Sequence, residues 1–188
     1  MGWMHKYSAA NPAYRIRPTL RFVFSHPAHA LALFFGAGVM RPGPGTWGTA
    51  AGVLVWAALV QWLDWRALVA LILVTFVAGV WASEKTGRDL GVQDAGCIVI
   101  DEVVAVWLVC LCFPQTPLCW ALSFAAFRVF DIVKLPPAAW IDNHMHSGLG
   151  VMLDDLLAAV WAVAAILALD WAAVRFFGSA ASIAGIFG

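Results

Sequence analysis

The sequence has few charged residues. Asp, Glu, Lys and Arg make up 12% of its 188 residues, whereas a soluble domain carries about 25%. Hydrophobic residues make up 63% of the chain, and the mean hydropathy is +0.84. This composition excludes an ordinary soluble domain and indicates an integral membrane protein. The formal net charge is zero, which argues against nucleic acid as a partner.

The apolar stretches also lack the alternation of polar and apolar residues that is typical of transmembrane β-strands. They are continuous, and they predict an all-α integral membrane bundle of about five helices, with runs over residues 48–63, 67–83, 98–113, 118–133 and 156–177. A shorter run, 28–39, predicts a helix that lies in the membrane interface. Because the first four long runs are short for spanning, we expect neighbouring helices to shelter some of them.

A secretory signal and a cysteine metal motif are missing as well. The first 22 residues carry scattered charges and two prolines, which is not typical of a signal peptide. The four cysteines lack metal-site spacing, and we expect them to be small buried hydrophobic residues: Cys97, Cys110, Cys112 and Cys119. From the positions of the apolar runs we divide the chain into a cytoplasmic N-terminal segment (1–27), a membrane-embedded domain (28–178) and a C-terminal tail (179–188).

The charged residues fall mostly on one side when the five runs are threaded through a membrane. Nine of the eleven Lys and Arg residues share the side of residues 1–47: Lys6, Arg15, Arg17, Arg21, Arg41, Lys85, Arg88, Arg128 and Lys134. The positive-inside rule makes that side cytoplasmic. Nine of the eleven acids lie there too, and only Asp64 and Asp170 lie opposite. Because acids do not follow the positive-inside rule, their clustering needs another cause.

Two adjacent acids, Asp101 and Glu102, lie near the start of the third run. Neighbouring helical residues point about 100° apart, so both side chains can line one cleft. The alternative is favourable pairing with the helix dipole, which stabilises by up to about 1 kcal/mol. Ionisable residues at membrane depth usually mark function, and this favours the cleft.

A second charged segment, FRVFDIVK, ends the fourth run. Arg128, Asp131 and Lys134 are spaced by three residues and share one helix face. The alternative is a salt-bridge ladder along the helix, whose two cations also suit the dipole at the helix C-terminus. Asp131 at the same end opposes the dipole, so this alternative explains two of the three residues. A face that carries a cation, an acid and a cation suits an anionic substrate beside a metal ligand.

Two glycine-rich segments have alternative interpretations. The turn at Ser147, just before Asp154 and Asp155 at the expected start of the last helix, either cradles phosphate or caps that helix. The segment RPGPGTWGT, residues 41–49, is either a rigid loop that allows close approach or simply a turn. The pair Gly48 and Gly52 predicts close helix packing.

The acids lack paired His or Cys ligands, and oxygen ligands alone suit a hard cation. Magnesium is usually held by one or two carboxylates together with substrate phosphate and water. We therefore predict a cluster of one or two Mg²⁺ ions. The metal-binding and catalytic candidates are Asp101, Glu102, Asp131, Asp154 and Asp155, and Arg128 and Lys134 are candidates for phosphate binding.

Three stretches together resemble the phosphatidylglycerophosphatase A family in order and spacing: GAGVMRPGPGTWGT, TGRDLGVQDAGCIVIDEVVAVW and FRVFDIVKLPPAAWIDNHMHSGLGVMLDDLLA. The similarity covers roughly residues 26–160. It implies a magnesium-dependent phosphatase of the bacterial inner membrane that converts phosphatidylglycerophosphate to phosphatidylglycerol. The family's acids fall on Asp94, Asp101, Glu102, Asp131, Asp142, Asp154 and Asp155, and its cations on Arg128 and Lys134.

We therefore expect a multi-pass phosphatase with its site on the cytoplasmic face and a phospholipid substrate from the membrane. Asp94 and Asp142 join Arg128 and Lys134 as expected substrate-phosphate residues. Either a water or a carboxylate attacks phosphorus. An ion or proton transporter is the alternative function, and a non-catalytic scaffold of lipid-synthesis complexes is a third. The sequence leaves the oligomeric state open, and a homo-oligomer is possible.

Overall fold

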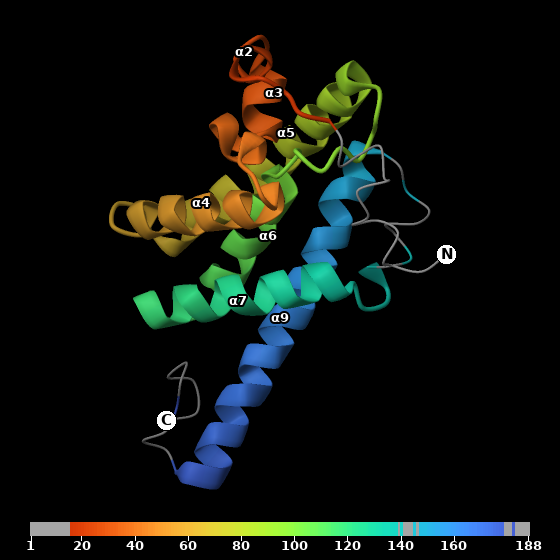
Figure 1. Ribbon diagram of the computed structural model, residues 1–188. Coiled ribbons are helices and arrows are strands. Elements are labelled where there is room, and N and C mark those ends of the chain that lie inside the picture. Colours follow the sequence, from red (N-terminus) through yellow and green to blue (C-terminus); the bar gives the residue numbers. More distant parts are fainter. Residues whose placement is uncertain (1–15, 139, 141–144, 146, 179–181, 183–188) are drawn as a thin grey trace.

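The computed structural model describes residues 16–138, 140, 145, 147–178 and 182, and every element in these residues is helical (Figure 1). The long helices are α4 (Pro44–Leu59), α5 (Trp65–Leu90), α6 (Ile100–Leu111), α7 (Pro117–Val133) and α9 (Gly148–Phe177). Shorter elements precede them: α2 (Leu20–Val23), α3 (Pro27–Ala32) and the 3-10 segment η2 (Phe34–Val39). The all-α prediction is confirmed, and each predicted long run overlaps one long helix.

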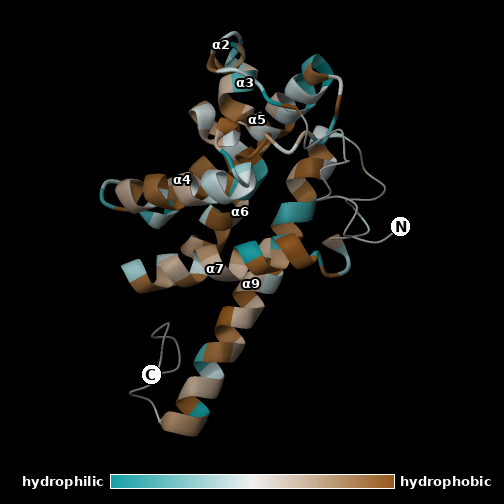
Figure 2. Cartoon of the chain, in the orientation of Figure 1, coloured by the Kyte–Doolittle hydropathy of each residue, from teal (hydrophilic) through white to brown (hydrophobic). Residues whose placement is uncertain are grey.

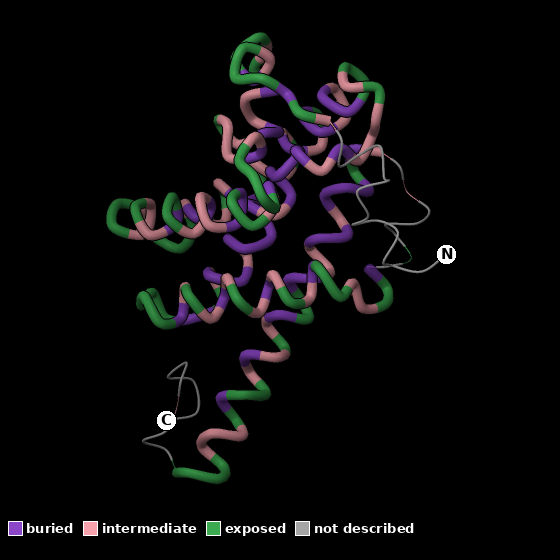
Figure 3. The backbone as a smooth tube through the Cα atoms, in the orientation of Figure 1, coloured by how far each residue is buried: buried purple, intermediate pink, exposed green. Residues whose placement is uncertain are grey.

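Helix α6 forms the centre of the bundle and packs against α4, α5, α7 and α9. Figure 1 shows it between α4 and α7, and Figure 3 shows that most of it is buried. Its core side chains include Val103, Val104 and Val106, which are fully buried. Burial of such apolar side chains stabilises the fold by about 1.5–3 kcal/mol each. At 12 residues α6 is about 18 Å long, and the four helices packed around it cover most of its side chains.

Within the part of the chain that the structure describes, two helices are long and apolar enough to cross a membrane: α5 with 26 residues and α9 with 30. Helices α4 and α7 have 16 and 17 residues. Figure 2 shows that all four are largely hydrophobic, and Figure 1 shows the C-terminal half of α9 extending away from the other helices. That half exposes large apolar side chains, among them Leu169, Trp171 and Phe176. The structure therefore has the apolar surface of a membrane-associated protein.

Polar side chains cap the starts of α5, α7 and α9. Asp64, Thr116 and Ser147 each accept a hydrogen bond from the backbone N–H three residues further on, at 2.8, 3.3 and 3.3 Å. Such caps satisfy N–H groups that a helix start leaves without partners. At its other end, α5 stops at Gly91, whose φ of 72° is in the left-handed region that glycine adopts without strain.

Several boundaries differ from the sequence prediction: α4 begins and ends four residues before the run 48–63, and α5 ends at Leu90, seven residues beyond the run 67–83. Helix α9 begins at Gly148, eight residues before the predicted run 156–177, because the cap at Ser147 starts the helix in a polar stretch that hydropathy does not detect. The predicted helix over 28–39 is divided into α3 and η2. The chain breaks there because Phe34 and Phe35 adopt left-handed backbone, with φ of 40° and 54°.

The cysteines of the described chain are free thiols. Cys97, Cys110 and Cys119 are buried, as predicted. Cys112 is exposed, so the prediction of burial was wrong for this residue. It is the C-cap of α6, and the neighbouring Cys110 and Phe113 are buried.

Gly48 and Gly52 let α4 approach α6 closely, as the G-x-x-x-G spacing predicts. A β-carbon on Gly48 would lie 2.5 Å from Val99 Cβ, and one on Gly52 would lie 3.3 Å from Val103 Cα. The carbonyl of Gly52 also accepts a 2.8 Å hydrogen bond from the indole of Trp107. These contacts hold α4 against α6 from their starts to the middle of each helix.

We expect Gly48→Val to destabilise the protein by about 1–3 kcal/mol, because the added side chain has no room beside Val99. Thermal unfolding in detergent measures this as a lower midpoint temperature. Ala58→Val, on the exposed side of α4, is the matched control and should leave the midpoint nearly unchanged. Equal effects in the two variants would contradict the close packing of α4 on α6.

Candidate active site

A cavity of about 270 Å³ lies where α4 and α6 begin, α7 ends and the first turns of α9 pass. Eight of the nine residues that the sequence predicts for the site line this cavity: Asp94, Asp101, Glu102, Arg128, Asp131, Lys134, Asp154 and Asp155. The ninth, Asp142, lies outside the described residues. The fold therefore brings together charged residues that the sequence distributes over four segments.

Each acidic pair lies on a helix packed into the core. Asp101 and Glu102 occupy the first turn of α6, where carboxylates also interact favourably with the helix dipole. Asp154 and Asp155 lie in the second turn of α9, not at its start as the sequence suggested. Because α6 and α9 pack against each other, the two pairs face the same cavity.

Three carboxylates converge: Asp101, Glu102 and Asp155 each offer an oxygen within 4.8 Å of the others. Asp101 Oδ1, Glu102 Oε2 and Asp155 Oδ2 are buried and have no hydrogen-bond partner among the described residues. Burial of polar oxygens without partners is costly, and repulsion between the like charges adds to this cost. A cation relieves both, so this all-oxygen donor set fits a hard divalent ion.

Arg128 and Lys134, the cations among the described residues that line the cavity, pair with Asp131 and Asp154. Arg128 Nη1 lies 2.6 Å from Asp131 Oδ2 and 3.7 Å from Glu102 Oε1. Lys134 Nζ contacts Asp154 Oδ2 of α9. Lys134 ends α7 with a left-handed φ of 46°, so it is not part of the ladder that its spacing on the helix allowed. The five predicted metal ligands therefore divide into three that converge and two that are held by cations.

Residues 43–46 also line the cavity, and from Pro44 onward they form the first turn of α4 rather than the loop or turn predicted for residues 41–49. A β-carbon on Gly45 would overlap Glu102 Oε1 and would lie 3.1 Å from Arg128 Nη1. Only glycine lets the first turn of α4 come this close to both charged side chains. The signal in the sequence was the glycine and proline pattern of RPGPG, but its meaning depends on what packs against it.

The turn at Ser147 is a helix cap, so the alternative of a phosphate cradle was wrong. The N–H of Gly148 donates a 2.7 Å hydrogen bond to Glu84 Oε2 in α5. A β-carbon on Gly148 would overlap the carbonyl of Val80, and one on Gly150 would overlap the carbonyl of Met145. These glycines serve close packing, and they are not among the described residues that line the cavity.

The acids predicted on the opposite side of the membrane do not join the cavity. Asp64 caps α5, and Asp170 is buried in α9, where it accepts a 2.9 Å hydrogen bond from Ser182. A transport path would need ionisable groups that continue across the membrane. Within the described part of the chain the acids concentrate at one cavity, which does not favour the transporter alternative.

Comparison with known proteins places this site in a family. The family model for phosphatidylglycerophosphatase A matches residues 30–170, which include every residue named above as lining the cavity. The chain belongs to the phosphatidylglycerophosphatase A family. The resemblance read from the three sequence stretches is thereby confirmed.

Relatives of this phosphatidylglycerophosphatase A family member cover most of its length. It is 37% identical to the phosphatidylglycerophosphatase A of Haemophilus influenzae over 155 residues. This aligned region covers 82% of this chain and 95% of the relative. It is 36% identical over 141 residues to the phosphatidylglycerophosphatase A of Escherichia coli, and the aligned region covers 74% of this chain and 81% of the relative. A Bacteroides thetaiotaomicron protein named putative phosphatidylinositol-3-phosphatase is 35% identical over 144 residues, covering 73% and 89%. No solved structure matches the chain.

Proposed function

We propose that the protein is a phosphatidylglycerophosphatase that hydrolyses phosphatidylglycerophosphate to phosphatidylglycerol and inorganic phosphate. The observation that carries this proposal is the meeting of three carboxylates, each with a buried oxygen, and two cations in one cavity. Membership of the family and the names of the Haemophilus and Escherichia relatives support the substrate. The net reaction breaks the bond between phosphorus and the glycerol oxygen, and water supplies the oxygen and protons of the products.

Magnesium is the cofactor in this proposal, with Asp101, Glu102 and Asp155 as its ligands. When bound, it neutralises phosphate charge as a Lewis acid. Arg128 and Lys134 bind phosphate oxygens from the α7 side of the cavity. Their contacts with Asp131 and Asp154 hold both cations at the cavity wall, so they need little reorganisation when substrate enters.

We place the cavity at the cytoplasmic face of a bacterial inner membrane. The distribution of Lys and Arg supports this orientation. In this arrangement α5 and α9 span the bilayer. Helices α4 and α7, about 24–26 Å long, cross it as well, and α6 is sheltered among these four helices. The lipid phosphate enters the cavity past Thr46 and Ile132, which are exposed at its rim, while the acyl chains stay in the bilayer.

Release of phosphate from phosphatidylglycerophosphate by the detergent-purified protein tests the proposal. We expect release with Mg²⁺, a loss of about 100-fold or more with a chelator, and recovery when Mg²⁺ is added back, because the three carboxylates need a cation to bind phosphate. Chelator already saturated with Mg²⁺ is the control.

The metal site and the phosphatase activity can each be refuted separately. Release that survives complete chelation would refute the metal site but not the phosphatase. Ion flux in sealed vesicles without any phosphate release would refute the phosphatase and support the transporter.

A further inference from the structure

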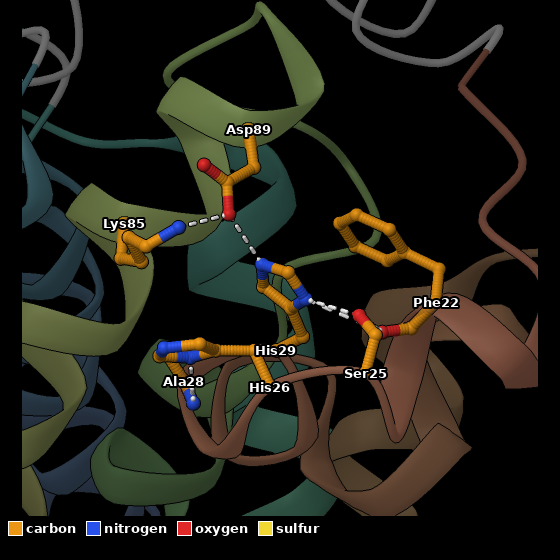
Figure 4. Close-up of polar contacts among 7 residues, drawn as sticks. All are labelled: Phe22, Ser25, His26, Ala28, His29, Lys85 and Asp89. Atoms are coloured by element: carbon orange, nitrogen blue, oxygen red, sulfur yellow. Dashed lines mark hydrogen bonds and ion pairs between the residues drawn. The ribbon is translucent and has the colours of Figure 1, made fainter.

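His29 lies in α3, outside the cavity, and both of its ring nitrogens are engaged (Figure 4). Nε2 lies 2.7 Å from Asp89 Oδ2 in α5, and Nδ1 lies 3.0 Å from Ser25 Oγ and 3.2 Å from the carbonyl oxygen of Phe22. The imidazole stacks on the ring of Phe22 at 4.1 Å, with 11° between the planes. Only 5% of His29 is exposed. The ring is therefore fixed in both position and orientation.

Asp89, the partner of His29, is held as well. Lys85, one turn earlier in α5, contacts the same carboxylate oxygen (Figure 4). A carboxylate only accepts hydrogen bonds, so Nε2 of His29 carries a hydrogen and donates it. Hydrogen bonds to a charged partner are stronger than those between neutral groups. His29 thus links α3 to the end of α5 through a charge-assisted contact in which the imidazole is buried and Asp89 is partly exposed.

The same helix α3 holds the start of α6. Val99, the N-cap residue of α6, has no side-chain cap, and its N–H donates a 2.9 Å hydrogen bond to the carbonyl of Ala32, the last residue of α3. In η2, a β-carbon on Gly38 would overlap the carbonyl of Cys97. The backbone that leads into the first turn of α6 therefore rests on α3 and η2.

We propose that His29 is a positioning residue for the phosphatase reaction. By fixing α3 to α5 it sets Ala32, which shares its helix face, and through Val99 it sets the acids of the first turn of α6. A metal site works only when its ligands are held within about 0.5 Å of the productive geometry. His29 is not among the residues that line the cavity, so its effect on Asp101 and Glu102 is indirect. This inference rests on the proposed function.

The test compares His29→Ala, His29→Gln and Asp89→Ala in the full-length, detergent-purified protein. Loss of an outer contact that orients metal ligands typically costs 10–100-fold in metal affinity or activity. We therefore expect His29→Ala to raise the Kd for Mn²⁺, measured by electron paramagnetic resonance, by about 10-fold and to lower kcat by about as much. KM should stay within about twofold, because the phosphate-binding cations lie on α7.

Two comparisons separate positioning from general stability. His29→Gln retains an N–H donor for Asp89 and should recover part of both losses. Combining His29→Ala with Asp89→Ala should add little further loss, because each change already breaks the contact between His29 Nε2 and Asp89. Asp89→Ala also supplies the result if His29→Ala fails to fold.

Gln115→Ala is the matched control, because it removes polar links at the opposite end of α6. There the amide of Gln115 donates to the carbonyls of Cys110 and Phe113 at 2.9 and 2.6 Å, and its oxygen accepts from Trp56 at 2.7 Å. We expect it to lower the melting temperature while the Kd for Mn²⁺ and kcat stay at wild-type values.

Wild-type values of Mn²⁺ affinity and kcat in both His29→Ala and Asp89→Ala would overturn the proposal. If wild-type protein binds no Mn²⁺, the metal assignment fails, and the kcat comparison still decides the role of His29. If wild-type protein releases no phosphate, the proposed function fails. The comparison of Mn²⁺ affinities then decides the role of His29.

Discussion

Asp101→Asn is expected to lower kcat for phosphatidylglycerophosphate by about 1,000-fold. Asparagine keeps the size and shape of a side chain that is 9% exposed in the first turn of α6, so the packing around it is retained. The substitution removes one of three converging negative charges and therefore weakens the binding of a divalent cation. Phosphate release from mixed micelles gives kcat, and Mn²⁺ binding gives the metal affinity of the same preparation.

Asp64→Asn is the matched control for this experiment. Asp64 caps α5 with a 2.8 Å hydrogen bond, and asparagine is an equally good cap, so kcat and Mn²⁺ affinity should stay at wild-type values. The change of charge and size is the same as in Asp101→Asn, but it lies outside the cavity. Full magnesium-dependent activity of Asp101→Asn would show that the site is assigned to the wrong residues.

Arg128→Gln is expected to lower kcat/KM by about 100-fold or more. The guanidinium lies between Asp131 Oδ2 at 2.6 Å and Glu102 Oε1 at 3.7 Å. Its loss leaves these buried carboxylates without their counter-charge and removes a donor for phosphate oxygens. Arg128→Lys should recover only part of the activity, because an ammonium cannot form the two parallel hydrogen bonds of a guanidinium.

Steady-state kinetics with phosphatidylglycerophosphate measure the effect of Arg128→Gln. Arg66→Gln is the control, since Arg66 lies near the start of α5, outside the cavity, where its guanidinium sits 5.3 Å from the ring centre of Trp65. It should retain wild-type kcat/KM. A change at Arg128 that alters melting temperature but leaves kcat/KM unchanged would assign this residue a purely structural role.

Much of the candidate site could be predicted without coordinates. The runs of apolar residues locate the helices, and threading them predicts that most acids share one side of the membrane. The spacing of Arg128 and Asp131 places both on one face of α7, and they form an ion pair there. The same spacing allowed Lys134 to join them, but it contacts Asp154 on α9 instead. Local spacing could not predict this, because the contact depends on how α7 and α9 cross.

The glycines show the same limit of prediction from local sequence spacing. Gly48 and Gly52 were predicted to bring two helices together, since close approach is the usual reason for that spacing. Gly45 has no such pattern, and its importance depends on Glu102 and Arg128, which lie far away in the chain. The turn at Ser147 could either cap a helix or bind phosphate, and the contact of Gly148 with Glu84 decided for the cap.

The sequence by itself determined the helical class, the apolar character, the family and eight charged residues of the cavity. Hydropathy, helical spacing and motif order carry these properties along a single chain. The tertiary structure decided which three carboxylates converge, and it revealed that His29 joins α3 to Asp89. Such contacts link residues from different helices. Their distances depend on the angles and separations at which those helices pack, and no local sequence pattern specifies these.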